Sequence, residues 1–319
     1  MVKEYDWKKH YSSQLQLIHE TSNMKQYFFK NRTGYGYVRE LQVFAGMQII
    51  CNDLYLYKSG KNVPLSNKVI EITCCLEGRY ECEVSDRYCF YMCAGDLAVG
   101  AVGRVESRGY FPAGRFRSVT IFVEPDIFSV EGRMIVKHLG LDFNAVWELA
   151  VRKPHYFILH QDPGIVRIMT ALAASAESEN MPRIKLAALS LLQLLCEMKD
   201  VPEDTTVYLN RNQIRLAKLV HARLAEDLSG HLTIGQLSEE LGASPTSIKT
   251  AFKSVYGMPV YAWQRQYRLL EAQRLLRETE LPAAEIAQLA GYGNPGKFSG
   301  AFRQMFGITP TQYRNSLPA

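Results

Sequence analysis

Hydrophobic and polar residues alternate along the chain from about Met47 to Val123, in short runs rich in β-branched and aromatic residues. The runs read VIEITCCLEG, RYECEVS, RYCFYMC, GDLAVGAVG and FRSVTIFVE, and Gly, Asp and Ser residues separate them. Alternation with turn residues at even spacing predicts antiparallel strands. We therefore expect a small β-barrel or double-sheet jelly roll in this part of the chain.

Further along, apolar residues take on the spacing of helices. Two amphipathic segments, PGIVRIMTALAASAESE and PRIKLAALSLLQLLCEMKD, begin at Pro163 and Pro182 and meet at a turn near Asn180. The second segment carries an apolar face made of Leu186, Leu189, Leu192, Leu195 and Cys196. Such a face has to be buried, either on the chain's own β-domain or against a second copy, and the sequence leaves both open.

A repeat with an offset of fifty residues marks the C-terminal part. SPTSIKTAFKSVYGMP, which begins at Ser244, returns as NPGKFSGAFRQMFGITP, which begins at Asn294. Ser and Asn are good N-cap residues, and the proline that follows each suits the first helical position. Gly257 and Gly307 end the two segments, as C-terminal glycines do. Each copy is therefore predicted to be one short helix.

A second helix precedes each copy. Thr233 and Gln236 have capping-box spacing ahead of LSEEL and Gly242, while Pro282 opens AAEIAQLA and Gly291 closes it. Helix, glycine-bearing turn and second capped helix form a helix-turn-helix, so the chain has two such units. Between them, PVYAWQRQYRLLEAQRLLRE has apolar residues at helical steps and predicts a linking helix of about five turns.

The net charge of +5 lies entirely in the last third of the chain, where residues 211–319 hold 13 Lys and Arg against 8 Asp and Glu. The rest of the chain holds 24 of each. A basic surface attracts the phosphate backbone of nucleic acid. A solvated basic face on an ordinary helical domain is the alternative, but the two helix-turn-helix units favour double-stranded DNA as the partner.

The segment from about Ile214 to Arg314, including the terminal GITPTQYR, resembles the DNA-binding domain of AraC/XylS-family transcription regulators. The resemblance implies two sub-domains joined by a linker helix, with recognition helices that enter successive major-groove segments on one face of DNA. GYGNPGKFSGAF is most similar to the branch that includes the pyochelin regulator, whose members often sense ferric siderophores. A metal–siderophore complex is therefore our first guess for the effector, although no effector-binding residue follows from the sequence.

Helix geometry assigns the two faces of each recognition helix. Side chains three and four positions apart enter the core, and the exposed side near the helix start reaches base edges. The inward stripes are Ile248, Ala251, Phe252 and Val255 in the first helix, and Phe298, Ala301, Phe302 and Met305 in the second. The base contacts that we expect are Thr246, Lys249, Thr250, Pro295, Gly296, Ser299 and Gly300. Lys249 can donate to guanine, and a threonine methyl can touch thymine.

The second recognition helix offers poorer chemistry to bases. Family members often carry arginine where this chain has Gly300. We therefore predict that the first unit supplies most of the sequence discrimination and that the second mainly grips phosphates. The phosphate contacts that we expect are Ser244, Lys253, Arg265, Arg268, Asn294, Lys297, Arg303 and Arg314. For the cations the alternative is a salt bridge on the protein's own surface, for example between Arg268 and Glu271 or Glu240.

The β-domain is similar to the cupin-type sensory domain of many AraC relatives, in pattern and in turn placement. Catalytic cupins generally hold a metal through clustered histidines, yet residues 47–123 contain no histidine. We expect no catalytic residue, no metal and no cofactor, and instead a pocket lined by apolar and aromatic side chains.

Five cysteines lie between Cys74 and Cys93. Alternation predicts that Cys74 and Cys82 point into the core, whereas Cys75, Cys89 and Cys93 have the opposite parity. No CxxC pair is present. Packing as small hydrophobes is the favoured interpretation, and thiol sensing is the alternative.

The fold class expected is α+β, with a cupin-like effector-binding domain over residues 1–135, a helical dimerisation segment over 136–200 and a DNA-binding domain over 210–319. No apolar run reaches a membrane span and the first residues lack the apolar core of a signal peptide, so we expect a cytoplasmic protein. The function expected is an effector-responsive transcription regulator, with activation favoured, that acts as a homodimer and contacts RNA polymerase. The alternatives are a constitutive DNA-binding protein and a cupin enzyme fused to a DNA-binding module.

Overall fold

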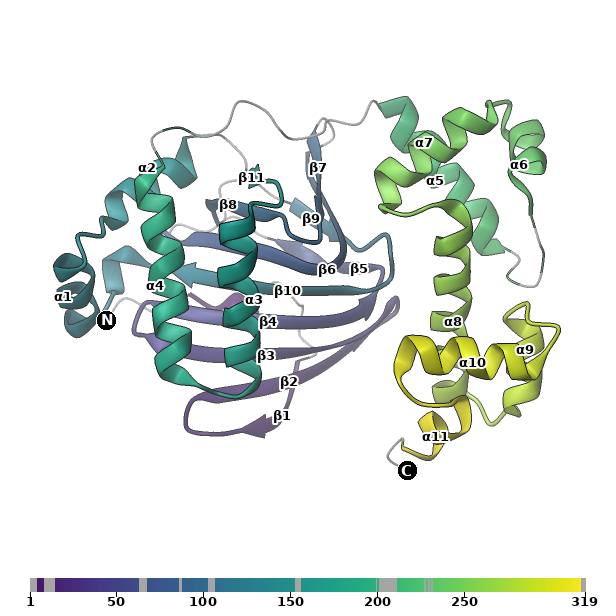
Figure 1. The fold of residues 1–319 in the computed structure, drawn as a ribbon, viewed down its shortest axis with the longest axis horizontal. Coiled ribbons are helices and arrows are strands. Elements are labelled where there is room, and N and C mark those ends of the chain that lie inside the picture. The colour runs from purple at the N-terminus through teal and green to yellow at the C-terminus, as the bar shows by residue number, and fades with distance from the viewer. Residues whose placement is uncertain are drawn as a thin grey trace. The chain divides into compact units, whose positions relative to one another are not determined.

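The computed structural model describes residues 5–8, 15–62, 68–85, 88–102, 107–152, 156–198, 200, 211–226, 228, 230 and 232–316. The chain divides into two compact units, residues 1–208 and 209–319. The first is an antiparallel sheet with helices and the second is helical, so the α+β class and the antiparallel sheet are confirmed (Figure 1). That the sheet domain is of the cupin type stays a prediction. Cys89 lies where no side chain is described.

The strands of the first unit are β1 (Gln16–Glu20), β2 (Met24–Asn31), β3 (Gly34–Phe44), β4 (Met47–Leu56), β5 (Lys58–Asn62), β6 (Ile70–Ser85), β7 (Tyr88–Cys93), β8 (Leu97–Ala101), β9 (Ser107–Tyr110), β10 (Phe116–Val123) and β11 (Phe157–Leu159). In the described residues the main sheet has the order β1-β2-β3-β4-β10-β6-β8-β11. Strands β1 to β3 precede residues 47–123, the stretch in which alternation predicted strands, so the sheet is wider than the sequence pattern predicted.

Strand β6 belongs to two sheets. Its first half pairs with β10 and β8, and its second half pairs with β7 and β9. The two segments VIEITCCLEG and RYECEVS, which we expected as separate strands, are this one strand. Between its halves Gly78 has a φ of 85°, and a Cβ there would lie 1.9 Å from the carbonyl oxygen of Arg115. Only glycine fits this close approach, which lets the second half leave the plane of the main sheet.

Helices cover one face of the main sheet (Figure 1). They are α1 (Val130–His138), α2 (Phe143–Val151), α3 (Pro163–Glu177) and α4 (Met181–Glu197). The core on this side joins strand residues such as Ile72 and Ile121 to helix residues such as Met169 and Leu192. The apolar face of the segment expected to mediate dimerisation is therefore buried mostly on the chain's own sheet, while Leu186 is 67% exposed.

The opposite face of the sheet has its own core, which is rich in aromatic residues. This arrangement corrects the parity argument for the cysteines. Cys74 faces the helices, whereas Cys75 and Cys82 both lie in the aromatic core. A register shift between β10 and β6 beside Cys75 changes the alternation, and both faces are covered, so parity does not separate core from surface here.

The second unit consists of α5 (Arg211–Glu226), α6 (Ile234–Leu241), α7 (Pro245–Tyr256), α8 (Val260–Glu278), α9 (Ala283–Leu289), α10 (Pro295–Phe306) and α11 (Pro310–Asn315). The predicted linking helix is α8, which runs from one helix-turn-helix unit to the other (Figure 1). Helix α5, which packs against α7, was not predicted.

Candidate functional sites

The first helix-turn-helix consists of α6 and α7. The Thr233 side chain accepts from the Gln236 backbone N–H, and the Gln236 side chain accepts in return from Thr233, so the predicted capping box is present. Gly242 turns the chain with a φ of 61°. Ser244 then accepts from the Ser247 backbone N–H, 3.1 Å away, and opens α7. The turn between the helices is thus set by local sequence.

The two faces of α7 are as predicted. Ile248, Ala251, Phe252 and Val255 are at most 1% exposed. Thr246, Lys249, Thr250 and Lys253 are exposed, as is Ser244 at the cap. No carboxylate pairs with Lys249 or Lys253 in the part of the chain that the structure describes. Contact of these residues with DNA stays a prediction.

The second helix-turn-helix, α9 and α10, repeats this construction. The Asn294 side chain accepts from the backbone N–H groups of Gly296 and Lys297, at 2.8 and 3.1 Å. Phe298 and Phe302 are buried, while Ala301 and Met305 are half-buried. On the other face Pro295, Gly296, Lys297, Gly300 and Arg303 are exposed and Ser299 is half-buried. The Asn294 side chain therefore satisfies the first two N–H groups of α10, as an N-cap does.

The arginines that we expected at phosphates fall into two groups. Arg303 and Arg265 are exposed, and Arg265 donates to the Gln304 side chain at 2.7 Å. Arg314 is half-buried and donates to the carbonyl oxygens of Leu276 and Thr279, so it holds α11 against the end of α8.

Arg268 requires a correction. It is 8% exposed and donates to the carbonyl oxygen of Gly230 at 2.7 Å. A Cβ at Gly291, in the turn after α9, would lie 3.0 Å from its Cζ atom. The phosphate role predicted for Arg268 is wrong, because the guanidinium is enclosed between the loop before α6 and the turn after α9. Arg268 instead ties the two helix-turn-helix units to the linking helix.

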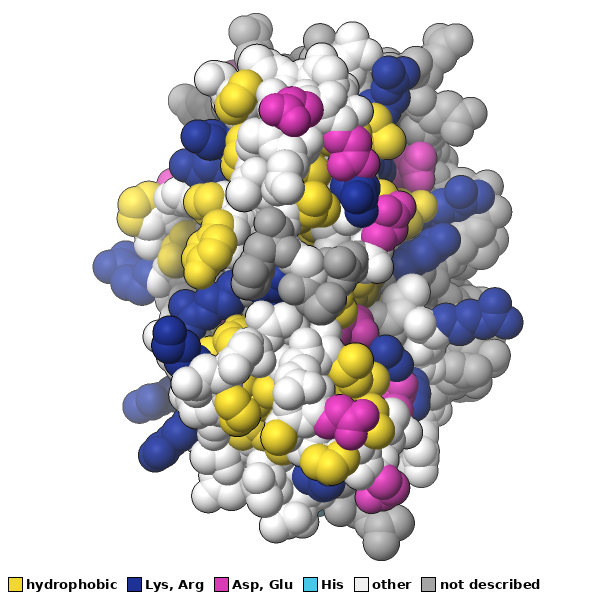
Figure 2. Space-filling view, turned by 90° about the vertical axis from the view of Figure 1, so that its right-hand side faces the viewer, with side chains coloured by type: hydrophobic (Ala, Val, Ile, Leu, Met, Phe, Trp, Pro, Cys, Tyr) yellow, Lys and Arg dark blue, Asp and Glu magenta, His cyan; other side chains and the backbone are white. Residues whose placement is uncertain are grey.

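Basic side chains are prominent in one view of the surface. Figure 2 shows Lys and Arg side chains in dark blue along the left edge of the view, where almost no acidic side chain lies. Toward the opposite edge acidic and basic side chains are mixed (Figure 2). The edge without acidic side chains is the one suited to a polyanion.

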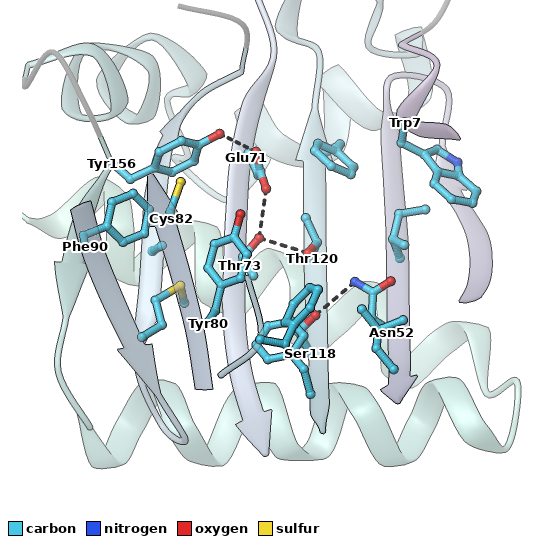
Figure 3. Close-up of a pocket in the computed structure, with 17 residues that line it drawn as sticks. Trp7, Asn52, Glu71, Thr73, Tyr80, Cys82, Phe90, Ser118, Thr120 and Tyr156 are labelled. Atoms are coloured by element: carbon cyan, nitrogen blue, oxygen red, sulfur yellow. Dashed lines mark hydrogen bonds between the residues drawn. The ribbon is translucent and has the colours of Figure 1, made fainter. Parts of the chain in front are cut away.

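The first unit contains a pocket beside the aromatic core. The pocket has about 800 Å³ of empty space, part of it open to solvent, and its walls come chiefly from β4, β6, β7 and β10. Register explains its polar stripe: Asn52 lies opposite Ser118, and Thr73 opposite Thr120. The Asn52 amide donates to Ser118 at 3.0 Å, and the two threonine hydroxyls lie 2.9 Å apart (Figure 3).

Glu71 lies at one end of this stripe. Its Oε1 atom accepts from the Thr73 hydroxyl at 3.2 Å, and its Oε2 atom accepts from the Tyr156 hydroxyl (Figure 3). Burial, reinforced by Glu71 itself, raises the pKa of Tyr156 well above its ordinary value, so the phenol stays protonated and donates. Sequence reasoning missed this site, because its members come from separate strands and no local motif marks them.

The thiols are protonated in this environment. Burial raises the pKa of Cys74 and of Cys51 to about 12. The thiolate is the reactive form, so these cysteines behave as small hydrophobes. Within the described residues no three His, Cys, Asp or Glu side chains converge as metal ligands would, and no helix there has the length and apolarity to span a membrane.

Comparison with known proteins locates a matching family model, described as a helix-turn-helix domain, at residues 237–316. The chain is 29% identical over 164 residues to the transcriptional activator RhaR of Enterobacter sp. (strain 638), covering 51% of this chain and 58% of that protein. It is 35% identical over 81 residues to the transcriptional regulator ExsA of Pseudomonas aeruginosa, covering 25% and 29%. The matches thus span less than two thirds of both relatives.

The chain is 21% identical to a transcriptional regulator from Chromobacterium violaceum, described as an AraC-type DNA-binding domain-containing protein, with a TM-score of 0.32 over 34% of this chain and 100% of that one.

Proposed function

We propose that this chain, which carries an AraC-type helix-turn-helix domain at its C-terminus and whose relatives are transcription regulators, binds promoter DNA in response to a small molecule. The observation that carries the proposal is the pair of capped recognition helices, α7 and α10, each with a buried apolar face and an exposed polar one. An exposed face at the start of such a helix is what reads the major groove.

In the proposed complex both recognition helices enter the major groove of one duplex. In the first major-groove segment, base contacts come from Thr246, Lys249 and Thr250. In the second segment they come from Pro295, Gly296, Ser299 and Gly300. Phosphate contacts come from Ser244, Lys253, Arg265, Asn294, Lys297, Arg303 and Arg314. Arg314 contacts phosphate only through the guanidinium N–H groups that its two backbone hydrogen bonds leave free. The linking helix and Arg268 set the spacing between the two units.

The pocket of the first unit is the proposed effector site. Its aromatic walls with a few polar groups have the composition of small-molecule sites. An effector changes transcription only if it favours one state of the regulator over another by differential affinity. A constitutive regulator is the second candidate, and the open pocket disfavours it, because a β-domain with a purely structural role has no need of one.

A homodimer and contact with RNA polymerase complete the proposal. Closed two-fold symmetry is the commonest state of soluble oligomers, and exposed Leu186 on α4 gives one apolar point for such a contact. Activation is the direction we favour, since RhaR carries the description of an activator.

Selection of binding sites from random duplexes tests DNA recognition by the intact chain. We expect enrichment of a sequence with two elements about 10 base pairs apart, one for each recognition helix on successive turns of the groove. Affinity for that sequence should exceed affinity for scrambled DNA by at least ~10³-fold at ~150 mM salt. Equal retention of both duplexes would contradict the proposal.

A further inference from the structure

The charge of the pocket is one-sided. Of the described residues that line it, Glu71 is the only acidic one, and none is Lys, Arg or His. The walls otherwise consist of aromatic and aliphatic side chains and the short polar stripe. Among the described residues, a ligand in this space therefore meets one carboxylate and no cation.

Glu71 has no cation of its own. Its two hydrogen bonds, from Thr73 and Tyr156, come from neutral hydroxyls, and no Lys, Arg or His pairs with it among the described residues. A carboxylate beside apolar walls is costly unless a positive partner compensates it. The described residues supply orientation for this carboxylate but not the counter-charge.

The orientation of Glu71 is built into the sheet. Gly100 on β8 lies opposite Glu71 on β6. A Cβ at Gly100 would lie 2.7 Å from the ring of Tyr156, so the absence of a side chain leaves room for that ring. The phenol then reaches the carboxylate and holds it toward the cavity (Figure 3).

Aromatic rings face the same space. Tyr80 packs against Phe111 and Phe116, with ring centroids 5.6 Å apart in both pairs, and Phe90 lies near Tyr156 at 5.9 Å. Flat rings stack on such walls, and the negative faces of aromatic rings also attract a cation. Both properties of the walls agree with the charge of Glu71.

We propose that the pocket takes an aromatic ligand that bears a protonated amine, with the ammonium group bound to Glu71 and the ring held among Tyr80, Phe90 and Phe116. The inference rests on the proposed function, because it identifies the chemical class of that effector. Ligands that carry a carboxylate or a net negative charge, an anionic ferric siderophore among them, are disfavoured because they would set their charge against Glu71. This replaces the siderophore as the favoured effector class.

Three probes with one ring system and different end groups test the proposal: tryptamine, tryptophol and indole-3-propionate. Their affinities for the intact chain are measured by titration calorimetry at ~50 mM salt, where charge effects are only partly screened. We expect tryptamine to bind at least tenfold more tightly than tryptophol, because its ammonium group adds a Coulomb attraction to the carboxylate that the neutral hydroxyl of tryptophol does not supply. Indole-3-propionate should bind most weakly.

Substitution identifies the carboxylate. Glu71→Gln keeps the shape and removes the charge, so it should remove the tenfold preference for the amine and change tryptophol binding by less than about threefold. Glu83→Gln is the matched control, because Glu83 lies on the same strand and also accepts from a tyrosine hydroxyl, that of Tyr110 at 3.1 Å, but does not line the pocket. This control should retain the preference.

Three results would overturn the inference: equal affinity for the three probes, tightest binding of the acid, or no binding of any probe. The comparison on the unmodified chain needs no variant, so a folding defect in Glu71→Gln does not rescue the proposal. Site selection on random DNA is carried out with the same preparations. If DNA selection succeeds and the amine preference is absent, the ligand class is wrong and the regulator proposal stands; if selection fails, the regulator proposal itself is wrong.

Discussion

In the first helix-turn-helix unit, α7 presents Thr246, Lys249 and Thr250 from a helix that Ser244 caps, whereas in the second unit α10 presents two glycines and a half-buried serine from a helix that Asn294 caps. The scaffolds agree closely: proline follows the cap in both, and glycine in the left-handed conformation ends both helices. The two helices have equal caps and ends but unequal exposed faces. The capping residues therefore fix where the two recognition helices begin and end, while the exposed residues fix which bases each helix can contact.

The cores under the two helices also differ. Beneath α7, Phe252 and Tyr256 pack with Trp263 and with His221 from α5. Beneath α10, Phe298, Phe302 and Phe306 pack with one another. The second helix-turn-helix has no counterpart of α5 among the described helices, so its core depends on α8 and α11.

The largest difference in stability between the two helix-turn-helix units should follow substitution of their central phenylalanines. Phe252 and Phe302 are both fully buried, so either substitution to alanine should cost about 3–5 kcal/mol of unfolding free energy. Because the two cores are separate, Phe302→Ala should remove amide-exchange protection in α9 and α10 while α7 keeps most of its own. Phe252→Ala should have the converse effect. Hydrogen exchange on the intact chain measures each helix separately.

Tyr261→Ala is the control for that experiment, since this residue is 79% exposed and should change stability by less than about 0.5 kcal/mol. Equal loss of protection in both units after either substitution would show that they unfold as one body.

Where the sequence predicts this molecule well, the signal is local. Caps, first-turn prolines and terminal glycines lie within a few residues of the helix ends that they define, so α6 to α10 follow from the sequence alone. Strands β1 to β3 were missed because they lie at one edge of the sheet, where β1 is exposed along its whole length and polar residues are frequent in β2 and β3.

The failures share a different cause. Arg268 was assigned to phosphate from its place on the chain, yet its burial depends on Gly230 and Gly291, which only the fold brings beside it. Glu71 gave no signal, because an isolated glutamate in a strand has no motif. Its role follows from the register that places it opposite Phe122 and Gly100. Contacts of this kind join residues far apart in the sequence, and the spacing of hydrophobic residues along the chain does not predict them.

The stability of the core beneath α7 should depend on pH more strongly than that of the core beneath α10. Burial, and secondarily Lys218, lowers the pKa of His221 to about 4 from an ordinary value of 6.5. Between pH 6.5 and about pH 4 the unfolded chain therefore binds more protons than the folded one. The first helix-turn-helix is therefore fully stable above pH 6.5, and its stability falls as the pH is lowered toward 4. Between about pH 7 and pH 5 the loss should be about 2 kcal/mol.

Exchange protection in α7, corrected for the intrinsic pH dependence of exchange, measures this loss, and α10 serves as the internal reference because the chain has no histidine after His231. His221→Phe keeps the aromatic packing against Tyr256 and should abolish the difference. A pH profile that persists in this variant would assign the effect to another group.

The smallest and most specific difference concerns the lysines on the two recognition helices. Both Lys249 and Lys297 are exposed and lack a carboxylate partner among the described residues. The two substitutions therefore remove the same charge from two different recognition helices. Lys249→Ala should lose about 1–3 kcal/mol of discrimination at one base pair. Lys297→Ala should instead weaken binding to all sequences alike and lower the slope of log affinity against log salt by about 0.9. Arg274→Ala removes a charge that is already paired with Glu271 and Glu278, and should do neither. If the two lysine variants lost specificity equally, the second unit would read bases as well as the first, and the division between a reading helix and a gripping helix would fail.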